Sequence, residues 1–276
     1  MTGEPFSLPA FTMANYNLYR IDDRIFFAFI LAGLIFCAVH AARRAYRQPV
    51  STELPGGGSS HSDVKEEEEI QRHTIFQRIY HWLNSVAVLT LTISGWMIYQ
   101  PWGLYSAKPA VEGFFWHRWG VALLLVGIAF HMIYESFISK EPNPMAVNRR
   151  EARKIMATLR NFFGLSKAYP LPTKYHSGQI LFHWAMAGNL FLLILTGFVL
   201  WKPLRDLLPL SFLGLGWDFI YYNRLFHGFL AATLAASLIV HFYFALMIKK
   251  NWVETKSMIT GRVPAREYLE THSPLE

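Results

Sequence analysis

Five long apolar segments constrain this chain more than any other feature of its sequence. Each approaches the roughly 20 residues that a helix needs to cross the hydrocarbon core of a bilayer, and hydrophobic residues make up 53% of the chain. This pattern predicts an all-α integral membrane protein with five transmembrane helices, because helices satisfy their backbone hydrogen bonds internally. The expected spans are about 24–45, 79–100, 116–138, 179–201 and 224–248.

The basic residues predict how these spans are oriented. Lysine and arginine concentrate in the segments that follow the first, third and fifth spans, namely 43–47, 140–174 and 249–266. Cytoplasmic loops carry an excess of such residues, so we expect the N-terminus outside and the C-terminus in the cytoplasm. The N-terminus lacks the basic head of a secretory signal, which predicts a retained first helix. Topology accounts for the net charge of +7, and we expect no nucleic-acid partner.

Four parts are expected along the chain. The segment 1–47 holds an extra N-terminal transmembrane helix, and 48–72 reads as a flexible linker because it is rich in glycine and serine and then acidic. This linker suggests that the first helix is tethered to the remaining spans without being integral to them. The other parts are a four-helix bundle over 73–256 and a cytoplasmic tail over 257–276.

Two histidines of the last span, His227 and His241, lie fourteen residues apart. On an α-helix this separation corresponds to roughly 21 Å of rise and returns to within about 40° of the starting direction. Both imidazoles therefore face the same way at two depths in the bilayer. One helix could thus offer an axial ligand to each of two stacked haems.

An internal repeat supplies counterpart histidines. The second and fourth spans both begin with an aromatic residue followed by His-Trp, and each has a glycine fourteen positions after its histidine, Gly95 or Gly197. The third and fifth spans each carry two histidines fourteen residues apart. Two similar hairpins predict a four-helix bundle in which each half supplies ligands. The candidate ligands outside the last span are His81, His117, His131 and His183.

Depth sorts these candidates only in part. His117 and His227 both fall at the outer ends of their spans, so they pair at an outer site. At the inner side, His241 could pair with His81, His131 or His183, and the distance from flanking charges favours His131. The single cysteine, Cys37, excludes an internal disulfide, an iron–sulfur cluster bound by this chain alone and covalent haem attachment through C-x-x-C-H.

The segment from His73 to Pro274 resembles the cytochrome b (gamma) subunit of respiratory formate dehydrogenases. That subunit falls within the di-haem family that includes the b-type cytochromes of membrane-bound hydrogenases. The resemblance rests on five motifs, together with the His227 and His241 pair followed by Phe-Tyr. They are RIYHW at 78–82, His117 with a glycine three residues on, KYHSGQ at 174–179, TGFVLWKP at 196–203 and KSMITGRV at 256–263.

This resemblance implies a cofactor and its ligands. It implies two haem b groups, with His117 and His227 as axial ligands of the outer haem. For the inner haem it implies His81 with His241, because the family position that matches His131 is not a ligand. His131 therefore remains the alternative inner ligand that depth alone would favour.

The resemblance also implies a quinone site at the start of the fourth span. In that family the segment KYHSGQ lines a pocket for menaquinone or ubiquinone, normally with asparagine where this chain has His176. A histidine can donate a hydrogen bond to a quinone oxygen and supply a proton near neutral pH. The other candidates are Gly178 through its backbone N–H, Gln179 through its amide and His183 one turn farther along.

The implied function is electron transfer in the bacterial cytoplasmic membrane. Electrons would pass from an iron–sulfur partner at the outer face through both haems to quinone at the cytoplasmic side. Substrate oxidation would occur on a separate catalytic subunit, and the complex could form a higher oligomer. A hydrogenase or thiosulfate-type reductase anchor is an alternative in the same class. A haem-free transporter with proton-relay histidines is an alternative from another class.

Overall fold

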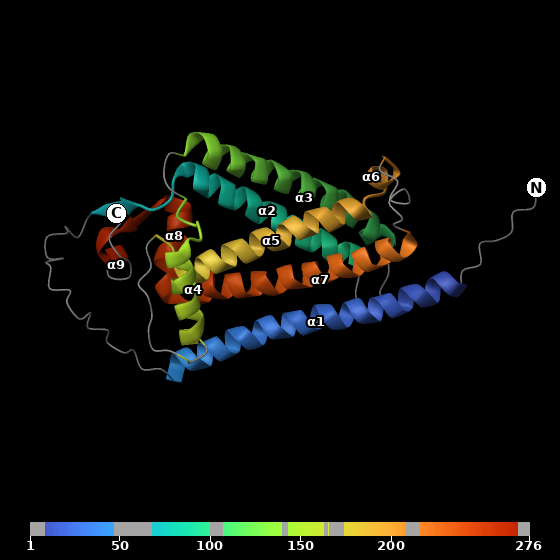
Figure 1. Ribbon diagram of the computed structural model, residues 1–276, viewed down its shortest axis with the longest axis horizontal. Helices are drawn as coiled ribbons and strands as arrows, with labels where there is room; N and C mark the ends of the chain where they lie inside the picture. The colour runs from blue at the N-terminus through green and yellow to red at the C-terminus, as the bar shows by residue number, and fades with distance from the viewer. Residues whose placement is uncertain are drawn as a thin grey trace, which may run out of the picture. The chain divides into compact units, whose positions relative to one another are not determined.

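The computed structural model describes residues 9–46, 68–99, 107–139, 143–162, 165, 174–207 and 216–269. Among these residues, five helices are long and apolar enough to cross a membrane, as the sequence predicted (Figure 1). Helices α3 and α7 each end in a π-helical segment, Tyr134–Ile138 and Tyr243–Met247. The long helices are α1 (Pro9–Tyr46), α2 (Ile75–Tyr99), α3 (Ala107–Ile133), α5 (Ser177–Leu200) and α7 (Trp217–Phe242).

Shorter elements lie outside the candidate membrane spans. One of them, α4 (Arg149–Phe162), is strongly amphipathic, in agreement with the basic helical pattern of its sequence. The others are α6 (Lys202–Leu207), a 3-10 turn at Lys249–Asn251, α8 (Trp252–Thr260), α9 (Ala265–Leu269) and the strands β1 (Glu69–Gln71) and β2 (Arg262–Pro264).

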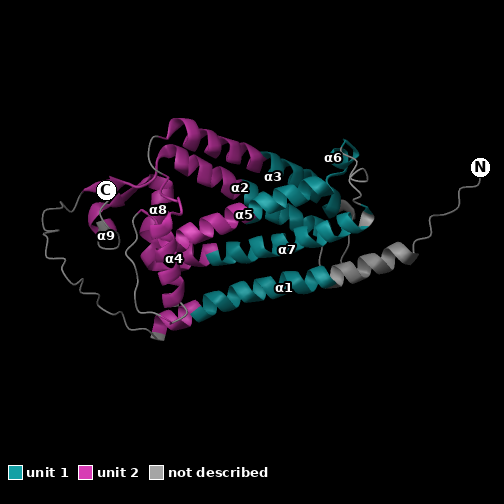
Figure 2. Cartoon of the chain, in the orientation of Figure 1, with its two compact units in different colours: residues 1–39, 87–122, 189–240 teal, residues 40–86, 123–188, 241–276 magenta. Residues whose placement is uncertain are grey.

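The chain divides into two compact units, which are coloured separately in Figure 2. Unit 1 comprises residues 1–39, 87–122 and 189–240, and unit 2 comprises residues 40–86, 123–188 and 241–276. Each unit thus draws on several of the long helices. The candidate ligands divide between them, with His117 and His227 in unit 1 and His81 and His241 in unit 2.

Within unit 1, the N-terminal helix α1 packs directly against its neighbours. Gly33 of α1 approaches the backbone of Ala236 on α7 so closely that an added Cβ would lie 3.3 Å from the Ala236 carbonyl oxygen. Phe29 and Phe229 make an edge-to-face ring contact at 5.1 Å. The expectation that the first helix is only tethered is therefore wrong for its part in unit 1. The glycine allows close helix approach, as small residues do in membrane bundles.

Within unit 2, strands β1 and β2 form an antiparallel ladder. It pairs the residues that precede α2 with the residues that follow α8. Gly261 makes the turn between α8 and β2 at a φ of 84°, a conformation that glycine adopts without steric cost. The predicted linker 48–72 thus includes three residues that form a strand, while its residues 48–67 lie outside the described part of the chain.

The start of α2 is fixed by a reciprocal capping box. The Thr74 hydroxyl accepts a hydrogen bond from the Gln77 N–H at 3.2 Å, and the Gln77 side chain accepts one from the Thr74 N–H at 3.2 Å. These two bonds satisfy donors that the helix itself leaves unpaired. The cap therefore defines where α2 begins, two turns before His81.

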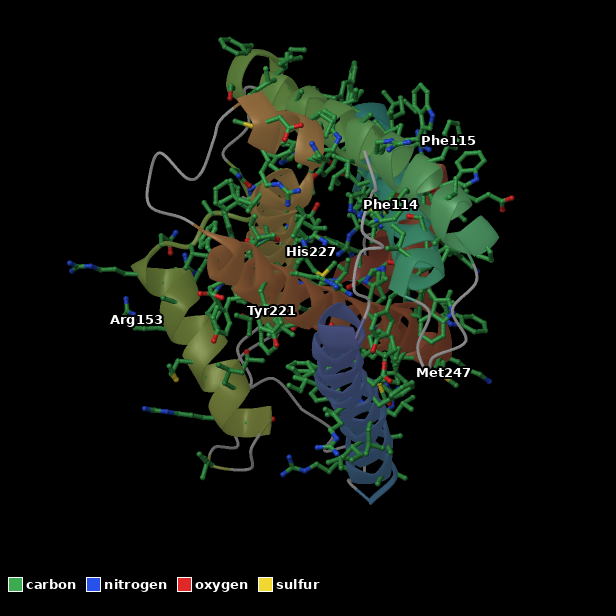
Figure 3. All side chains as sticks on the ribbon, turned by 90° about the vertical axis from the view of Figure 1, so that its right-hand side faces the viewer. Phe114, Phe115, Arg153, Tyr221, His227 and Met247 are labelled. Carbon is green, nitrogen blue, oxygen red and sulfur yellow. The ribbon has the colours of Figure 1, made fainter. Side chains whose placement is uncertain are left out.

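The long helices expose large apolar side chains, as a lipid-facing surface requires. Phe114 and Phe115 of α3, labelled in Figure 3, are 52% and 49% exposed. Soluble proteins rarely leave extended apolar surface open to water. Exposure of this kind along helices of membrane-spanning length is what a bilayer would cover.

Candidate functional site

In unit 1, His117 and His227 are each oriented by a hydroxyl group from a neighbouring helix. Ser94 Oγ of α2 lies 3.0 Å from Nδ1 of His117 on α3. Thr196 Oγ1 of α5 lies 2.8 Å from Nδ1 of His227 on α7. The two hairpins of the predicted repeat therefore hold their histidines in the same way.

The hydroxyl groups also determine which imidazole nitrogen carries the proton. Ser94 donates its own proton to the Leu91 carbonyl at 3.3 Å, and Thr196 donates to the Leu192 carbonyl at 2.7 Å. Each hydroxyl oxygen is then able to accept from an Nδ1–H, and in that tautomer Nε2 keeps a lone pair. A neutral imidazole with a free Nε2 lone pair is the form that binds a metal.

A glycine follows each of these hydroxyl residues and lies beside the same imidazole. A Cβ added to Gly95 would lie 3.8 Å from Cε1 of His117, and one added to Gly197 would lie 3.5 Å from Cε1 of His227. Any larger side chain would occupy the space next to the ring. The imidazoles of His117 and His227 also interact electrostatically, so the four helices bring both candidate ligands to one region of unit 1.

In unit 2, the rings of His81 and His241 face each other. Their centroids are 6.5 Å apart and their planes are inclined by 46°. With metal–nitrogen bonds of about 2 Å, two imidazoles on opposite sides of one iron would have a centroid separation of about 6 Å. The ring of Phe182 on α5 stacks on the His241 ring, with a centroid distance of 5.6 Å. The spacing of this pair thus fits an axial haem ligand pair.

His131 lies in a different environment. Its ring stacks on that of Tyr80 with a centroid distance of 4.1 Å, and it interacts electrostatically with Glu135 and His183. Among the described ring contacts, the histidine that meets His241 is His81. The structure therefore groups His131 with His183, the other candidate inner partner that depth left open.

The described residues contain no cluster of three or more His, Cys, Asp or Glu side chains that could hold a metal ion. A protein-bound ion usually requires three or four such ligands. Haem iron differs, because the porphyrin supplies four of its ligands and the protein supplies only the axial ones. A pair of histidines therefore suffices for haem iron.

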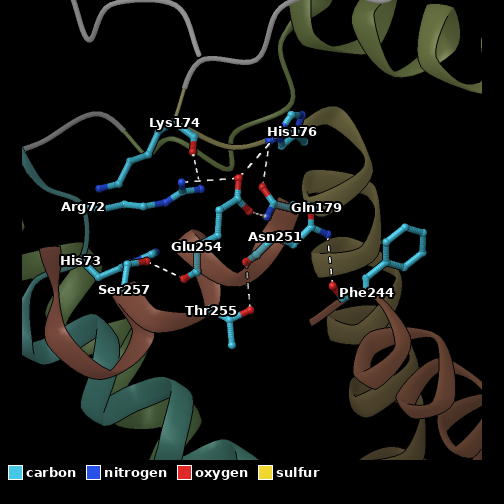
Figure 4. A network of polar contacts seen from close by, with 10 residues as sticks. All are labelled: Arg72, His73, Lys174, His176, Gln179, Phe244, Asn251, Glu254, Thr255 and Ser257. Carbon is cyan, nitrogen blue, oxygen red and sulfur yellow. Dashed lines mark hydrogen bonds and ion pairs between the residues drawn. The ribbon is translucent and has the colours of Figure 1, made fainter. Parts of the chain in front are cut away.

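Two of the predicted quinone residues, His176 and Gln179, belong to a polar network in unit 2 (Figure 4). The Gln179 side chain accepts a hydrogen bond from the His176 N–H at 2.9 Å and donates one to Glu254 at 2.6 Å. Glu254 Oε1 lies 3.6 Å from His176 Nε2 and 3.5 Å from Arg72 Nη1. A Cβ added to Gly178 would meet nothing within 4 Å, so the space beside this residue is open.

Two buried groups next to this network lie outside the membrane spans and have strongly shifted pKa values. Burial, reinforced by the positive charges of Arg72 and Lys174, lowers the pKa of His73 to about 3. Burial raises the pKa of the Tyr175 hydroxyl to about 12. His73 Nδ1 lies 3.0 Å from Ser257 Oγ. Both residues are therefore neutral in the folded chain at physiological pH.

Sequence reasoning missed four residues of these sites. Ser94 and Thr196 could have been found, because each directly precedes a glycine of the repeat. Arg72 and Glu254 carry no comparable signal, since they lie far apart in the sequence and meet only through the fold.

Comparison with known proteins identifies the family of this chain. The sequence model of the family described as prokaryotic cytochrome b561 matches residues 72–261. The chain is also 23% identical, over 215 residues, to the cytochrome b556(Fdn) subunit of the nitrate-inducible formate dehydrogenase from Escherichia coli strain K12. The alignment covers 74% of this chain and 88% of that subunit. The corresponding subunits of E. coli O157:H7 and Shigella flexneri match equally well.

The family match covers the four helices that carry the candidate ligands and leaves out α1. Because it spans more than half of the chain, this multi-pass membrane protein belongs to the prokaryotic cytochrome b561 family of b-type cytochromes.

Proposed function

We propose that this chain is the membrane subunit of a respiratory oxidoreductase complex and carries electrons through two b haems to quinone. The observation that carries the proposal is the pair of facing imidazoles His81 and His241, whose 6.5 Å separation suits two ligands of one iron. His117 and His227 are the proposed ligands of the second haem. When bound, haem supplies reversible one-electron transfer.

The chain's own residues prepare these ligands. The hydroxyl groups of Ser94 and Thr196 hold Nδ1–H of His117 and His227, so that Nε2 is available to iron. Gly95 and Gly197 keep space open beside the rings. Phe182 packs against His241 and limits how far its ring can turn.

The distribution of lysine and arginine supports an orientation of the chain in the membrane, and the family resemblance supports the direction of electron flow. With the N-terminus outside, His117 and His227 lie toward the outer face and His81 and His241 toward the cytoplasm. Electrons would then enter from an iron–sulfur subunit outside and leave on the cytoplasmic side. Proton uptake there would add to the membrane potential.

The start of α5 is the proposed quinone site, for menaquinone or ubiquinone. The residues that would meet the quinone are His176, through its imidazole, and Gly178, through its backbone N–H beside the open space. His183 lies on the same helix, farther into the membrane span. The helix N-terminus adds partial positive charge, which favours a carbonyl oxygen.

The catalytic partner proposed for this chain is a formate dehydrogenase, with its active site and iron–sulfur subunit at the outer face. Similarity to a formate dehydrogenase cytochrome subunit supports this choice. Purifying the chain from its native membrane and identifying the copurified subunits tests it. Recovery of a hydrogenase or a thiosulfate reductase in place of a formate dehydrogenase would change the complex and leave the electron path in place.

An absorbance spectrum of the purified protein tests the haem proposal. Reduction with dithionite should produce the α-band of b-type haem, and a haem assay should give two haems per chain. A ratio of one would remove one of the two proposed ligand pairs. Absence of the band would contradict the electron path altogether.

A further inference from the structure

The Gln179 amide at the start of α5 is bonded through both its oxygen and its nitrogen. Its oxygen accepts from the backbone N–H of His176 at 2.9 Å, and its nitrogen donates to Glu254 Oε2 at 2.6 Å. The first bond is half of a capping box, and the second links α5 to α8. With both its oxygen and its nitrogen bonded, Gln179 fixes the position of His176 and Glu254 relative to each other.

Glu254 stands between two basic groups. Its Oε1 atom lies 3.5 Å from Nη1 of Arg72 and 3.6 Å from Nε2 of His176, as the dashed lines in Figure 4 indicate. The Arg72 side chain is only 2% exposed, and Arg72 also donates to the Lys174 carbonyl at 3.0 Å. A buried guanidinium cannot lose its proton, so the carboxylate beside it stays ionised.

The charges around His176 therefore act in opposite directions. Arg72 and the nearby Lys174 disfavour an imidazolium, whereas the Glu254 carboxylate favours it. The His176 side chain is 30% exposed, so water can reach it, and the carboxylate is the anion in direct contact with its ring. A histidine in this setting can take a proton from water and hold it near neutral pH.

Quinone reduction needs such a group. A quinone becomes a quinol by taking up two electrons and two protons, one proton at each oxygen. At the α5 start, His176 lies two residues before Gly178, which is exposed and where an added Cβ would meet nothing within 4 Å. An asparagine at this position would offer a hydrogen bond alone, because an amide does not ionise.

We propose that His176 and Glu254 form a proton-donating pair at the quinone site, an inference that rests on the proposed function above. An N–H bond of the His176 imidazolium breaks as an O–H bond forms on the quinone, and His176 then recovers its proton from cytoplasmic water. The second proton comes from water, and the two electrons come from the haem path. Glu254 is a positioning residue that stabilises the imidazolium.

The test measures how fast the dithionite-reduced protein, freed of excess dithionite, is reoxidised by a short-chain quinone between pH 6 and 9. The wild-type rate should fall as pH rises and the imidazolium disappears. H176N should reduce the rate at least 10-fold and abolish this pH dependence. E254Q should shift the fall in reoxidation rate to a pH about one unit lower, since an opposite charge in contact shifts a pKa by one unit or more.

Two further variants separate this role from a structural one. E254D retains the carboxylate and should restore a profile close to the wild type. E69Q is the control. The Glu69 carboxylate on β1 pairs with Arg262, and its removal should leave the reoxidation rate and its pH profile unchanged. All variants should retain the wild-type α-band per chain. If E254Q loses haem, H176N still tests the proposal. Asparagine is a favourable residue at a helix start, so this variant should keep its fold.

The outcomes distinguish this pair from the proposed function. If no quinone reoxidises the wild-type protein, quinone reduction and the pair are both overturned. If quinone reoxidises the wild type but H176N keeps its rate and pH profile, only the pair is overturned. An E254Q profile that coincides with that of the wild type would remove Glu254 from the pair.

Discussion

Thr196 Oγ1 and His227 Nδ1 are joined by a hydrogen bond of 2.8 Å, which we assign to the threonine hydroxyl as acceptor. The direction follows from the second bond of that hydroxyl, which donates to the Leu192 carbonyl at 2.7 Å. A side-chain hydroxyl thus controls the proton on a proposed haem ligand. The same relationship holds between Ser94 and His117 on the other hairpin.

Replacing Thr196 by valine should weaken one haem site without repacking it. Valine keeps the shape of threonine but leaves the Nδ1–H of His227 without its acceptor, which costs about 1–3 kcal/mol. The ligand also becomes less basic, so the midpoint potential of that haem should rise. Redox titration of the α-band measures this shift, and T196S is the control that should retain the wild-type potential. An unshifted potential in T196V would contradict the role of the hydroxyl.

Replacing His81 by alanine should remove one of the two haems. His81 faces His241 with ring centroids 6.5 Å apart, whereas His131 stacks on Tyr80. H131A should therefore retain both haems. The haem-to-protein ratio of the two purified variants measures the difference, and loss of haem from H131A alone would reverse the assignment.

Introducing isoleucine at Gly33 should destabilise unit 1. An added Cβ would already lie 3.3 Å from the Ala236 carbonyl oxygen, so the larger side chain must push α1 away from α7, at a cost of about 1–3 kcal/mol. G188I is the matched control on α5, because a Cβ at Gly188 would meet nothing within 4 Å. Thermal unfolding in detergent, followed by tryptophan fluorescence, should give a lower midpoint for G33I only. Equal midpoints would mean that α1 contributes little to stability.

The stability of unit 2 should fall in mild acid because of His73. Burial is the main cause that lowers its pKa from 6.5 to about 3, Arg72, Lys174 and His81 add to the shift, and Glu254 opposes it. The unfolded chain therefore takes up this proton first as the pH falls. The contribution of the neutral imidazole is complete above pH 6.5 and is lost progressively toward pH 3.

The loss in the free energy of unfolding should approach about 1.4 kcal/mol per pH unit well below pH 6.5. Denaturant unfolding at pH 7.0, 6.0 and 5.0 measures it. H73N preserves a polar group opposite Ser257 but cannot ionise, and its stability should depend less on pH over this range. A wild-type slope no steeper than that of H73N would exclude His73 as the cause.

The sequence was sufficient to predict the membrane helices, and it also supplied the candidate ligands, whose role stays a prediction. A membrane span is a local property of about 20 apolar residues, and the repeat placed each histidine relative to its glycine. Depth alone favoured His131 as the partner of His241, because it measures position along the membrane normal and carries no information about which helix faces which. The contact between His81 and His241 is a property of helix packing.

Other features depend on contacts between distant residues and left no local signal. Strands β1 and β2 have three residues each, too few to show an alternating pattern. The linker composition suggested a tethered first helix, but the packing of α1 is set by the fit of Gly33 and Phe29 against α7. Glu254 lies in the predicted bundle segment, just beyond its last span, and its partners Arg72 and His176 precede it by several helices.

The β1–β2 ladder has a consequence for the order in which the protein is made. It pairs Gln71, just before α2, with Arg262, which is synthesised after every membrane span. Strand β1 therefore stays unpaired until the ribosome has completed the helices that follow it. Contacts between such distant residues form late, so the polar network around Glu254 is completed only once the end of the chain has left the ribosome.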